Sequence, residues 1–142
     1  MLFTAGYQGR SLPEFLAALE AAGIEQVIDV RRNALSRKRG FSKRALAEAC
    51  SSKGIAYVHV PELGVASELR KHLDSEQEYA QLFETYTRDL LPLAAHFVET
   101  TAGLIRDMVS AVVCFERDVT MCHRGPLAEV LARSTGFAVR HI

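Results

Sequence analysis

The sequence predicts a three-layer α/β domain, with a mostly parallel central sheet of about five strands flanked by helices. Two observations carry this prediction. Short segments rich in β-branched residues alternate with helical patterns along the chain, and such alternation pairs strands in parallel through right-handed crossovers. The segment Ala111–Phe115 is apolar throughout, which is typical of a strand covered on both faces. The 142 residues fit a single hydrophobic core, so residues 1–142 are treated as one domain.

Three strands and two helices are expected in the first half of the chain. Ser11 and Glu14 have the spacing of a capping box, and Gly23 is placed to end the helix that follows. Ser42 is expected to cap the second helix, with Phe41 and Leu46 as a hydrophobic staple. The strands are expected at residues 2–6, 26–30 and 55–60, and the second helix is expected to end at Gly54.

The second half is expected to contain more helix. Ser75 and Glu78 form another possible capping box, and apolar residues at helical spacing follow as far as Leu90. Pro92 is expected to break or kink this helix. Helical patterning then resumes in a set of apolar residues: Leu93, Phe97, Leu104, Ile105 and Met108. A strand at 110–115, a helix through Leu127, Val130 and Leu131, and a short strand at 137–142 complete the predicted order.

The charge is balanced overall but uneven along the chain. The formal net charge is zero, so the whole molecule is not expected to attract nucleic acid or acidic membranes non-specifically. The stretch from Arg31 to Arg44, however, contains seven cations and no acid. It indicates either a solvated loop or a mobile arm for a polyanion or a phosphorylated ligand.

The three cysteines are interpreted as reduced thiols in a cytoplasmic setting, because their number is odd and the chain is not a small stapled scaffold. The first residues lack the basic region and apolar stretch of a signal peptide. No apolar run approaches the roughly 20 residues of a membrane span, so no membrane partner is expected. The sequence indicates no oligomeric state.

Polar residues gather at the expected carboxyl ends of the strands, where ligands bind in open α/β sheets. The candidates for catalysis are Asp29, His59, Glu116 and Cys122. The candidates for binding a ligand or anion are Tyr7, Arg10, Arg31, Arg37, Glu62, Cys114, His123 and Arg124. Carboxylates and guanidinium groups placed together at one edge are costly without partners, so a functional site is expected there.

The loop that ends in Cys122, His123 and Arg124 leads directly into a helix. Free backbone N–H groups at a helix start favour an anion, and they also lower the pKa of a cysteine. Structural alternatives remain open for several candidates. Cys114 can be a small core residue, Asp29 can brace a loop, and Arg124 can pair with Glu116 or Asp118. His59 can be an interior histidine, and the neighbouring Cys122 and His123 can be adjacent by chance.

A metal centre is not predicted. Cys114, Cys122 and His123 offer three zinc ligands, but their spacing matches no familiar zinc motif and there is no C-x-x-C. The phosphate-binding, dinucleotide-binding and nucleophile-elbow glycine motifs are also absent, so no cofactor is predicted.

A set of short motifs, in one order from Thr4 to Arg124, resembles the domain-of-unknown-function 488 family. The motifs are Thr4-Ala5-Gly6-Tyr7, Arg10-Ser11-Leu12 with Phe15, Asp29-Val30-Arg31, Ser36-Arg37, Gly40-Phe41, Tyr57-Val58-His59, Pro61-Glu62-Leu63-Gly64, Cys114-Phe115-Glu116 with Asp118, and Cys122-His123-Arg124. The resemblance implies a small α/β protein of a largely bacterial and archaeal family, and it implies no particular reaction. One departure is the stretch after Asp29-Val30-Arg31, where family members usually have a proline and this chain has Arg32-Asn33-Ala34-Leu35.

Three functions compete at this point. The first is an enzyme, a hydrolase or transferase, acting on a phosphate-bearing ligand related to nucleotides or nucleic acid. Arg31 and Arg124 would hold the anion, Asp29 or Glu116 would move a proton, and His59 would assist.

The second function is a nucleic-acid or anion-binding module without catalysis, built on the basic stretch. The low aromatic content of 8% disfavours a base-stacking platform. The third is thiol or sulfur transfer by Cys122, since Asp29-Val30-Arg31 and the late cysteine distantly resemble rhodanese-type sulfurtransferases. The six-residue cysteine loop of those enzymes is absent.

Overall fold

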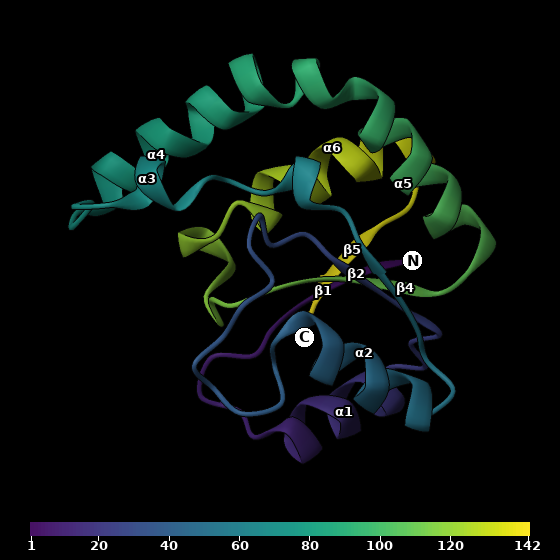
Figure 1. Ribbon diagram of the computed structural model, residues 1–142. Helices are drawn as coiled ribbons and strands as arrows, with labels where there is room; N and C mark the ends of the chain where they lie inside the picture. Colours follow the sequence, from purple (N-terminus) through teal and green to yellow (C-terminus); the bar gives the residue numbers. More distant parts are fainter.

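The computed structural model describes residues 1–142 and confirms the three-layer α/β prediction (Figure 1). Its sheet has the order β3-β2-β4-β1-β5, and every neighbouring pair of strands is parallel. The strands are β1 (Leu2–Gly6), β2 (Gln26–Asp29), β3 (Ala56–His59), β4 (Ser110–Cys114) and β5 (Val139–His141). Each lies within a segment predicted as a strand, and the observed strands are shorter by one to three residues wherever the bounds differ.

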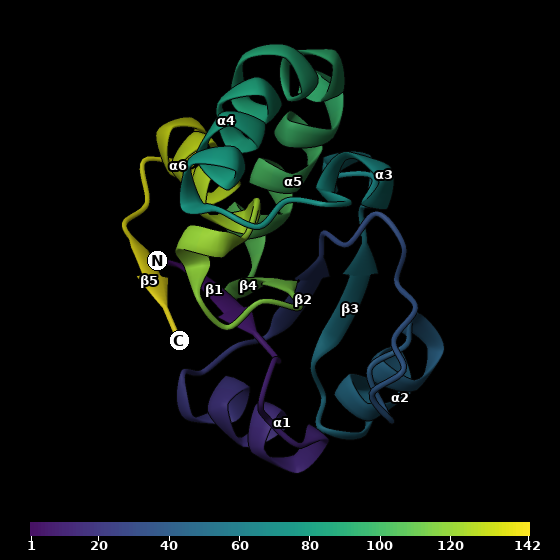
Figure 2. The same cartoon turned by 90° about the vertical axis from the view of Figure 1, so that its left-hand side faces the viewer.

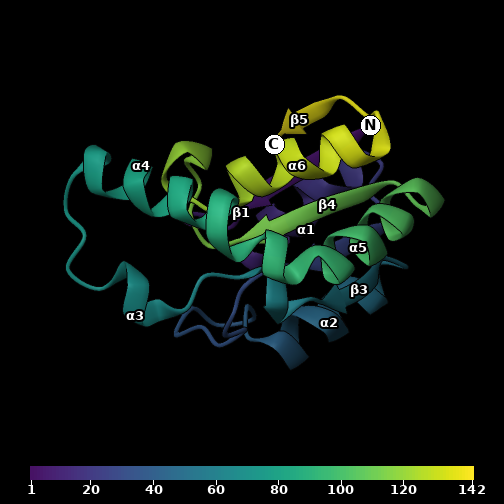
Figure 3. The same ribbon diagram turned by 90° about the horizontal axis from the view of Figure 1, so that it is seen from above.

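Helices cover both faces of the sheet. One face carries α1 (Leu12–Ala21) and α2 (Lys43–Ser52), and the opposite face carries α5 (Ala95–Asp107) and α6 (Arg124–Thr135), as Figure 1 shows. The short α3 (Ser67–Arg70) and α4 (Glu76–Thr85) extend beyond the sheet at the end where the strands finish (Figure 3). No helix has the length and apolar character needed to cross a membrane.

The strands divide their side chains between two apolar cores. Phe3, Val27 and Val113 belong to the core that includes Phe15 and Leu46 of α1 and α2. The neighbouring residues on the same strands point to the opposite face and enter the other core, which includes residues of α5 and α6. These residues are Leu2, Ile28 and Val112. All five residues of β4 are buried, as expected for a central strand covered on both faces.

The predicted helix caps are confirmed in part. Ser11 Oγ accepts a hydrogen bond from the Glu14 backbone N–H at 3.2 Å, and Gly23 follows α1 with a positive φ of 72°. Ser42 lies at the N-cap of α2 but makes no capping bond there. Its hydroxyl instead accepts from the backbone N–H of Ser36 and donates to the Ser36 carbonyl, which ties the basic stretch back to the start of α2.

The predicted break at Pro92 is confirmed, whereas the predicted apolar position of Leu93 is wrong. The helix that starts after Ser75 changes to π-type hydrogen bonding at Tyr86–Leu90, with the Leu91 N–H donating to the Tyr86 carbonyl at 2.8 Å. Pro92 lacks an N–H and crowds the preceding turn, so the regular helix gives way to π and 3-10 turns before α5 begins. Leu93, expected on the apolar face, is 87% exposed.

The strand order brings the ends of β2, β4 and β1 side by side at the carboxyl edge. The chain leaving β1 remains against the chain leaving β4, because the Gln8 N–H donates to the Phe115 carbonyl at 2.8 Å. Gly6 permits this close approach: a Cβ built there would lie 1.9 Å from the carbonyl oxygen of Glu116. The loop that carries Glu116 is therefore seated directly on the end of β1.

A Gly6→Ala substitution is expected to destabilise the fold by about 1–3 kcal/mol or more, because the new methyl group meets rigid backbone. Gly103→Ala is the matched control. Gly103 lies within α5 with nothing within 4 Å of a built Cβ, so alanine should stabilise that helix by about 0.5–1 kcal/mol. Urea denaturation measures both. Equal stability of Gly6→Ala and wild type would mean that the loop after β4 does not lie against β1.

Candidate functional site

A cavity of about 340 Å³ opens at the carboxyl edge of the sheet. The chain segments after β1, β2 and β4 form its floor. The basic stretch and α3, which lie side by side in Figure 2, form its walls. The charged side chains that line it are Arg31, Arg32, Arg37, Arg70 and Glu116. The neutral groups beside them include Tyr7, Ser36, Ser67, Cys114 and His123. We call this cavity the carboxyl-edge cleft.

A buried ion pair lies beneath the cleft. Arg31 Nη2 is 2.7 Å from Asp29 Oδ2, and Arg31 Nε donates to Asp29 Oδ1 at 2.9 Å. The backbone N–H of Arg31 also donates to Oδ1, and the Tyr57 hydroxyl donates to Oδ2. Asp29 has no exposed surface. The carboxylate is thus enclosed by protein donors, and this arrangement favours the alternative in which Asp29 braces the loop over the one in which it moves a proton of a substrate.

The guanidinium of Arg31 is also hydrogen-bonded mainly to other groups of the protein. Its Nη1 donates to the Tyr7 hydroxyl at 3.0 Å and to the Phe41 carbonyl at 2.6 Å. With the two bonds to Asp29, four of its five N–H groups have protein partners. Burial works to lower the pKa of Arg31, but the hydrogen bonds and charge of Asp29 outweigh it and raise the pKa. Arg31 therefore positions the cleft and offers a ligand one remaining N–H.

The Tyr7 ring links this ion pair to the core. It stacks on Phe41 with a centroid distance of 4.3 Å and an interplanar angle of 11°. The Arg31 guanidinium carbon lies 5.3 Å from the same ring centroid. The basic stretch is consequently anchored at Phe41, which fixes the wall of the cleft between β2 and α2.

A second polar cluster forms where β4 ends and α6 begins. His123 Nδ1 lies 4.0 Å from Cys114 Sγ and 3.9 Å from Cys122 Sγ. His123 Nε2 donates to the Val30 carbonyl at 2.9 Å. Glu116 Oε2 lies 3.5 Å from Cys114 Sγ, and Glu116 Oε1 pairs with Arg70 Nη1 at 3.0 Å. The adjacency of Cys122 and His123 therefore belongs to a compact cluster and is not incidental.

Cys122 corrects the expectation of a low-pKa thiolate. Burial raises the pKa of its thiol well above the usual value, the neighbouring Cys114 raises it further, and the contact with His123 only partly opposes this. Cys122 is 1% exposed and does not line the cleft. The start of α6 contributes one backbone N–H, from Arg124 at 3.5 Å, which is too little to offset removal from water.

Arg124 was expected to bind an anion, but its side chain is buried and bonded to the protein backbone. It is 1% exposed, and its guanidinium donates to the backbone carbonyls of Glu116 and Arg117. Arg124 therefore holds the loop after β4 in place. The expected pairing with Glu116 occurs through the backbone of that residue, while the Glu116 carboxylate stays free to face the cleft and Arg70.

Three further candidates lie outside the cleft. His59 Nε2 donates to the Arg31 carbonyl at 2.7 Å, so it supports the loop from β3. Glu62 lines a separate hollow near Leu69 and Leu93. Arg10 follows β1. Its pKa is lowered mainly by burial, and the nearby positive charges of Arg117 and Arg124 lower it further.

Arg32 and Arg70 were not among the candidates. Arg32 directly follows Arg31 in the basic stretch, so its position in the sequence was a usable signal. Arg70 comes from α3, a helix of four residues with no buried side chain. No periodicity or motif in the sequence around it indicated that this residue returns to the sheet edge.

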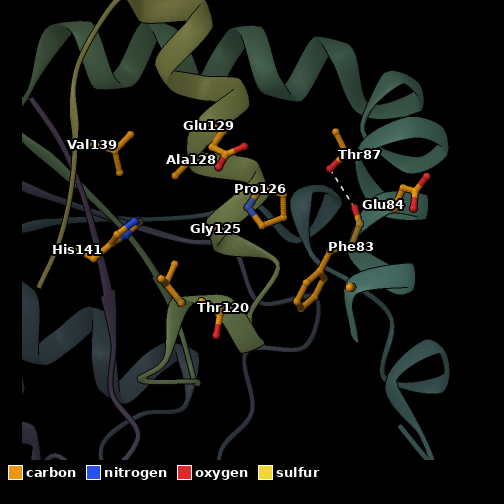
Figure 4. A pocket seen from close by; sticks show the side chains of 12 residues that line it. Phe83, Glu84, Thr87, Thr120, Gly125, Pro126, Ala128, Glu129, Val139 and His141 are labelled. Carbon is orange, nitrogen blue, oxygen red and sulfur yellow. Dashed lines mark hydrogen bonds between the residues drawn. The ribbon is translucent and has the colours of Figure 1, made fainter. Parts of the chain in front are cut away.

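A larger cavity, about 590 Å³, lies elsewhere, between α4, α6 and the edge strand β5. Figure 4 shows Phe83 of α4 and Pro126 of α6 on neighbouring walls of this cavity, with Glu129 on the next turn of α6. Its only ionisable side chains are two carboxylates and His141, so it has no guanidinium for an anion. The candidate site is therefore the smaller carboxyl-edge cleft, where the charged groups converge.

The chain matches the model of one protein family, described as "Domain of unknown function DUF488", over residues 11–131. The match covers most of the sequence, so the chain belongs to this family. This confirms the resemblance carried by the motifs. No curated protein and no solved structure matched the chain.

Breaking the buried ion pair is expected to be costly. Asp29→Asn or Arg31→Met should each lower the free energy of unfolding by about 3–5 kcal/mol, because one buried charge remains without its partner. The double variant Asp29→Leu/Arg31→Met should recover part of the loss. Arg88→Ala, which removes an exposed ion pair with Asp89, is the control and should change stability little. Chemical denaturation measures all four, and single variants as stable as the control would contradict the bracing role.

Proposed function

We propose that the protein is an enzyme that acts on a phosphate-bearing ligand, of nucleotide or nucleic-acid type, bound in the carboxyl-edge cleft. One observation carries the proposal: three arginines of the basic stretch and one from α3 line the same cleft as a single carboxylate. Arg31 and Arg70 already have carboxylate partners in Asp29 and Glu116. The other two guanidinium groups face the same cleft without a counter-charge, and because like charges repel, this arrangement favours an anionic ligand.

Two of these arginines have the freedom that an incoming anion requires. Arg32 and Arg37 are exposed and have no hydrogen bond or ion pair within the protein. Guanidinium groups match the geometry of phosphate oxygens and can bind them through paired hydrogen bonds. Arg32 and Arg37 are therefore assigned to the phosphate, while Arg31 keeps the cleft floor in position.

Glu116 is the side chain assigned to proton transfer. It is the only carboxylate in the cleft, with 20% of its side chain exposed, and Arg70 orients it through their ion pair. A carboxylate held at a fixed position beside a bound phosphate can take a proton from a nucleophile or return one to a leaving group. Asp29, enclosed by its own partners, is not part of this assignment.

Binding without catalysis, on nucleic acid, is the second candidate. The observation in its favour is that the basic stretch continues beyond the cleft, with Arg39, Lys43 and Arg44 exposed. A strand crossing these cations would release counterions, so its affinity would fall steeply with salt. A mononucleotide held by two arginines would show a shallower dependence. Sulfur transfer by Cys122 has no such support, because that thiol is buried and its pKa is raised.

Ligand binding is expected to raise the melting temperature of the wild-type protein against one class in a panel of nucleotides, sugar phosphates and short oligonucleotides. A ligand at 100 times its dissociation constant adds about 2.7 kcal/mol of stability. Arg32→Ala/Arg37→Ala should abolish the shift. Arg133→Ala/Arg140→Ala, which removes two exposed charges away from the cleft, should retain it. A panel without any shift, or the same shift in both double variants, would refute the anion site.

Glu116→Gln is expected to lower turnover of a ligand identified in this way by about 10²–10⁴-fold, the usual size of a general acid–base contribution. The variant should still show the melting shift, because the arginines remain. Glu129→Gln, at an exposed position of α6, is the control and should keep full activity. Binding without any turnover by the wild-type protein would favour the second candidate, and salt titration of oligonucleotide affinity would then measure the number of phosphate contacts.

A further inference from the structure

The second polar cluster has the composition of a metal centre. The ligand atoms of Cys114, Cys122 and His123 all lie within 4.8 Å of one another, and all three residues are buried. Their spacing in the sequence matches no familiar zinc motif, which is why no metal was predicted. The fold nevertheless joins the end of β4 to the start of α6, so that residues eight and nine positions apart meet.

We propose that Cys114, Cys122 and His123 bind a divalent metal ion that favours thiolate ligands, with Zn²⁺ as the preferred occupant. Tetrahedral zinc with ordinary Zn–S and Zn–N bond lengths places neighbouring ligand atoms roughly 3.6 Å apart. The distances from His123 Nδ1 to the two sulfurs, 4.0 and 3.9 Å, are only slightly longer. The two sulfurs lie within 4.8 Å of each other, so side-chain movement that brings them closer together would complete the tetrahedral geometry.

The orientation of His123 supports this assignment. Its Nε2 donates to the Val30 carbonyl at 2.9 Å, which leaves the lone pair of Nδ1 directed toward the two sulfurs. Metal-bound histidines usually donate their other ring N–H to a backbone carbonyl or a carboxylate, which fixes the tautomer. The Arg124 backbone N–H points to Cys122 Sγ at 3.5 Å, an arrangement that stabilises a thiolate ligand.

The charges balance when the ion is bound. Without metal, the single lone pair of Nδ1 accepts from one thiol, and Glu116 Oε2 accepts from Cys114 at 3.5 Å. Binding Zn²⁺ forms two Zn–S bonds and one Zn–N bond, and both thiols release their protons to solvent. Two thiolates then neutralise the two positive charges, so the buried site carries no net charge.

Three protein ligands leave the fourth coordination position of a tetrahedral ion open, and this position is expected to face the cleft. Cys114 and His123 both line the carboxyl-edge cleft, as does Glu116. The open position thus faces the cleft, where Glu116, a water molecule or a ligand can complete the coordination. Zinc sites with an open position are typical of catalytic centres, whereas closed sites are structural. The metal site stands on the cluster alone and does not depend on phosphate binding by Arg32 and Arg37.

Cys50 shows what a cysteine without this role looks like in the same chain. It is fully buried in the other core, among side chains such as Phe15 and Leu46, and no histidine or second cysteine forms a cluster with it. A Cys50→Ser variant therefore removes a buried thiol while leaving the proposed ligands intact. It is the matched control for Cys114→Ser and Cys122→Ser.

The test is titration of the reduced, chelator-treated full chain with Co²⁺ and Zn²⁺. Wild type and Cys50→Ser are expected to bind one ion per chain, and Co²⁺ should produce the near-ultraviolet absorption of cobalt–thiolate bonds. Calorimetry in buffers of different ionisation enthalpy should show release of about two protons per Zn²⁺. Cys114→Ser, Cys122→Ser and His123→Ala should weaken Zn²⁺ binding by more than about 100-fold, because even the loss of an outer-shell partner costs 10–100-fold.

The wild-type spectrum decides the matter even where a ligand variant fails to fold. Absence of cobalt–thiolate absorption in folded wild-type protein would overturn the proposal. Equal affinity of wild type and a folded Cys114→Ser or Cys122→Ser variant would overturn it too. So would a Cys114–Cys122 disulfide that resists treatment with reductant and leaves no metal-binding capacity.

Discussion

The buried ion pair between Asp29 and Arg31 is the interaction on which the carboxyl edge depends. It joins the last residue of β2 to the first turn of the basic stretch, and through Arg31 it reaches Tyr7 after β1 and Phe41 before α2. Tyr57 adds a donor from β3. Three strands and the helix-side core thus meet at one pair of charges. A buried charge without a partner would be unfavourable. Asp29 and Arg31 must therefore stay paired for either of them to remain buried.

Much of the fold followed from residue patterns because those patterns report local geometry. Capping at Ser11, the apolar character of β4 and the alternation of strands with helices all depend on short-range physics, and the parallel sheet follows from them. The order of the strands did not, since it depends on which apolar faces pack together across the whole chain. The change from α to π turns before Pro92 was likewise beyond reach, because several helical arrangements satisfy the same apolar spacing.

The location of the candidate site was predictable, but the parts played by its residues were less so. Charged residue types at the ends of parallel strands indicate where polar groups meet. They do not indicate whether the partner of an arginine is a ligand or the protein itself. Arg31 and Arg124 have protein partners, whereas Arg32 and Arg37 have none. Only the three-dimensional positions of Asp29 and of the Glu116 and Arg117 carbonyls distinguish these cases.

The two proposed functions of the edge meet at the end of β4. Cys114 and His123 belong to the floor of the arginine-lined cleft and also to the proposed metal centre, and Glu116 contacts both through Cys114 and Arg70. A metal ion there would add positive charge close to an anion held by the arginines, and its three ligands are buried. Electrostatic attraction is stronger in such surroundings than in bulk solvent. The arginines would hold the phosphate, Arg70 would orient Glu116, and the metal would act on whatever group reaches its open position.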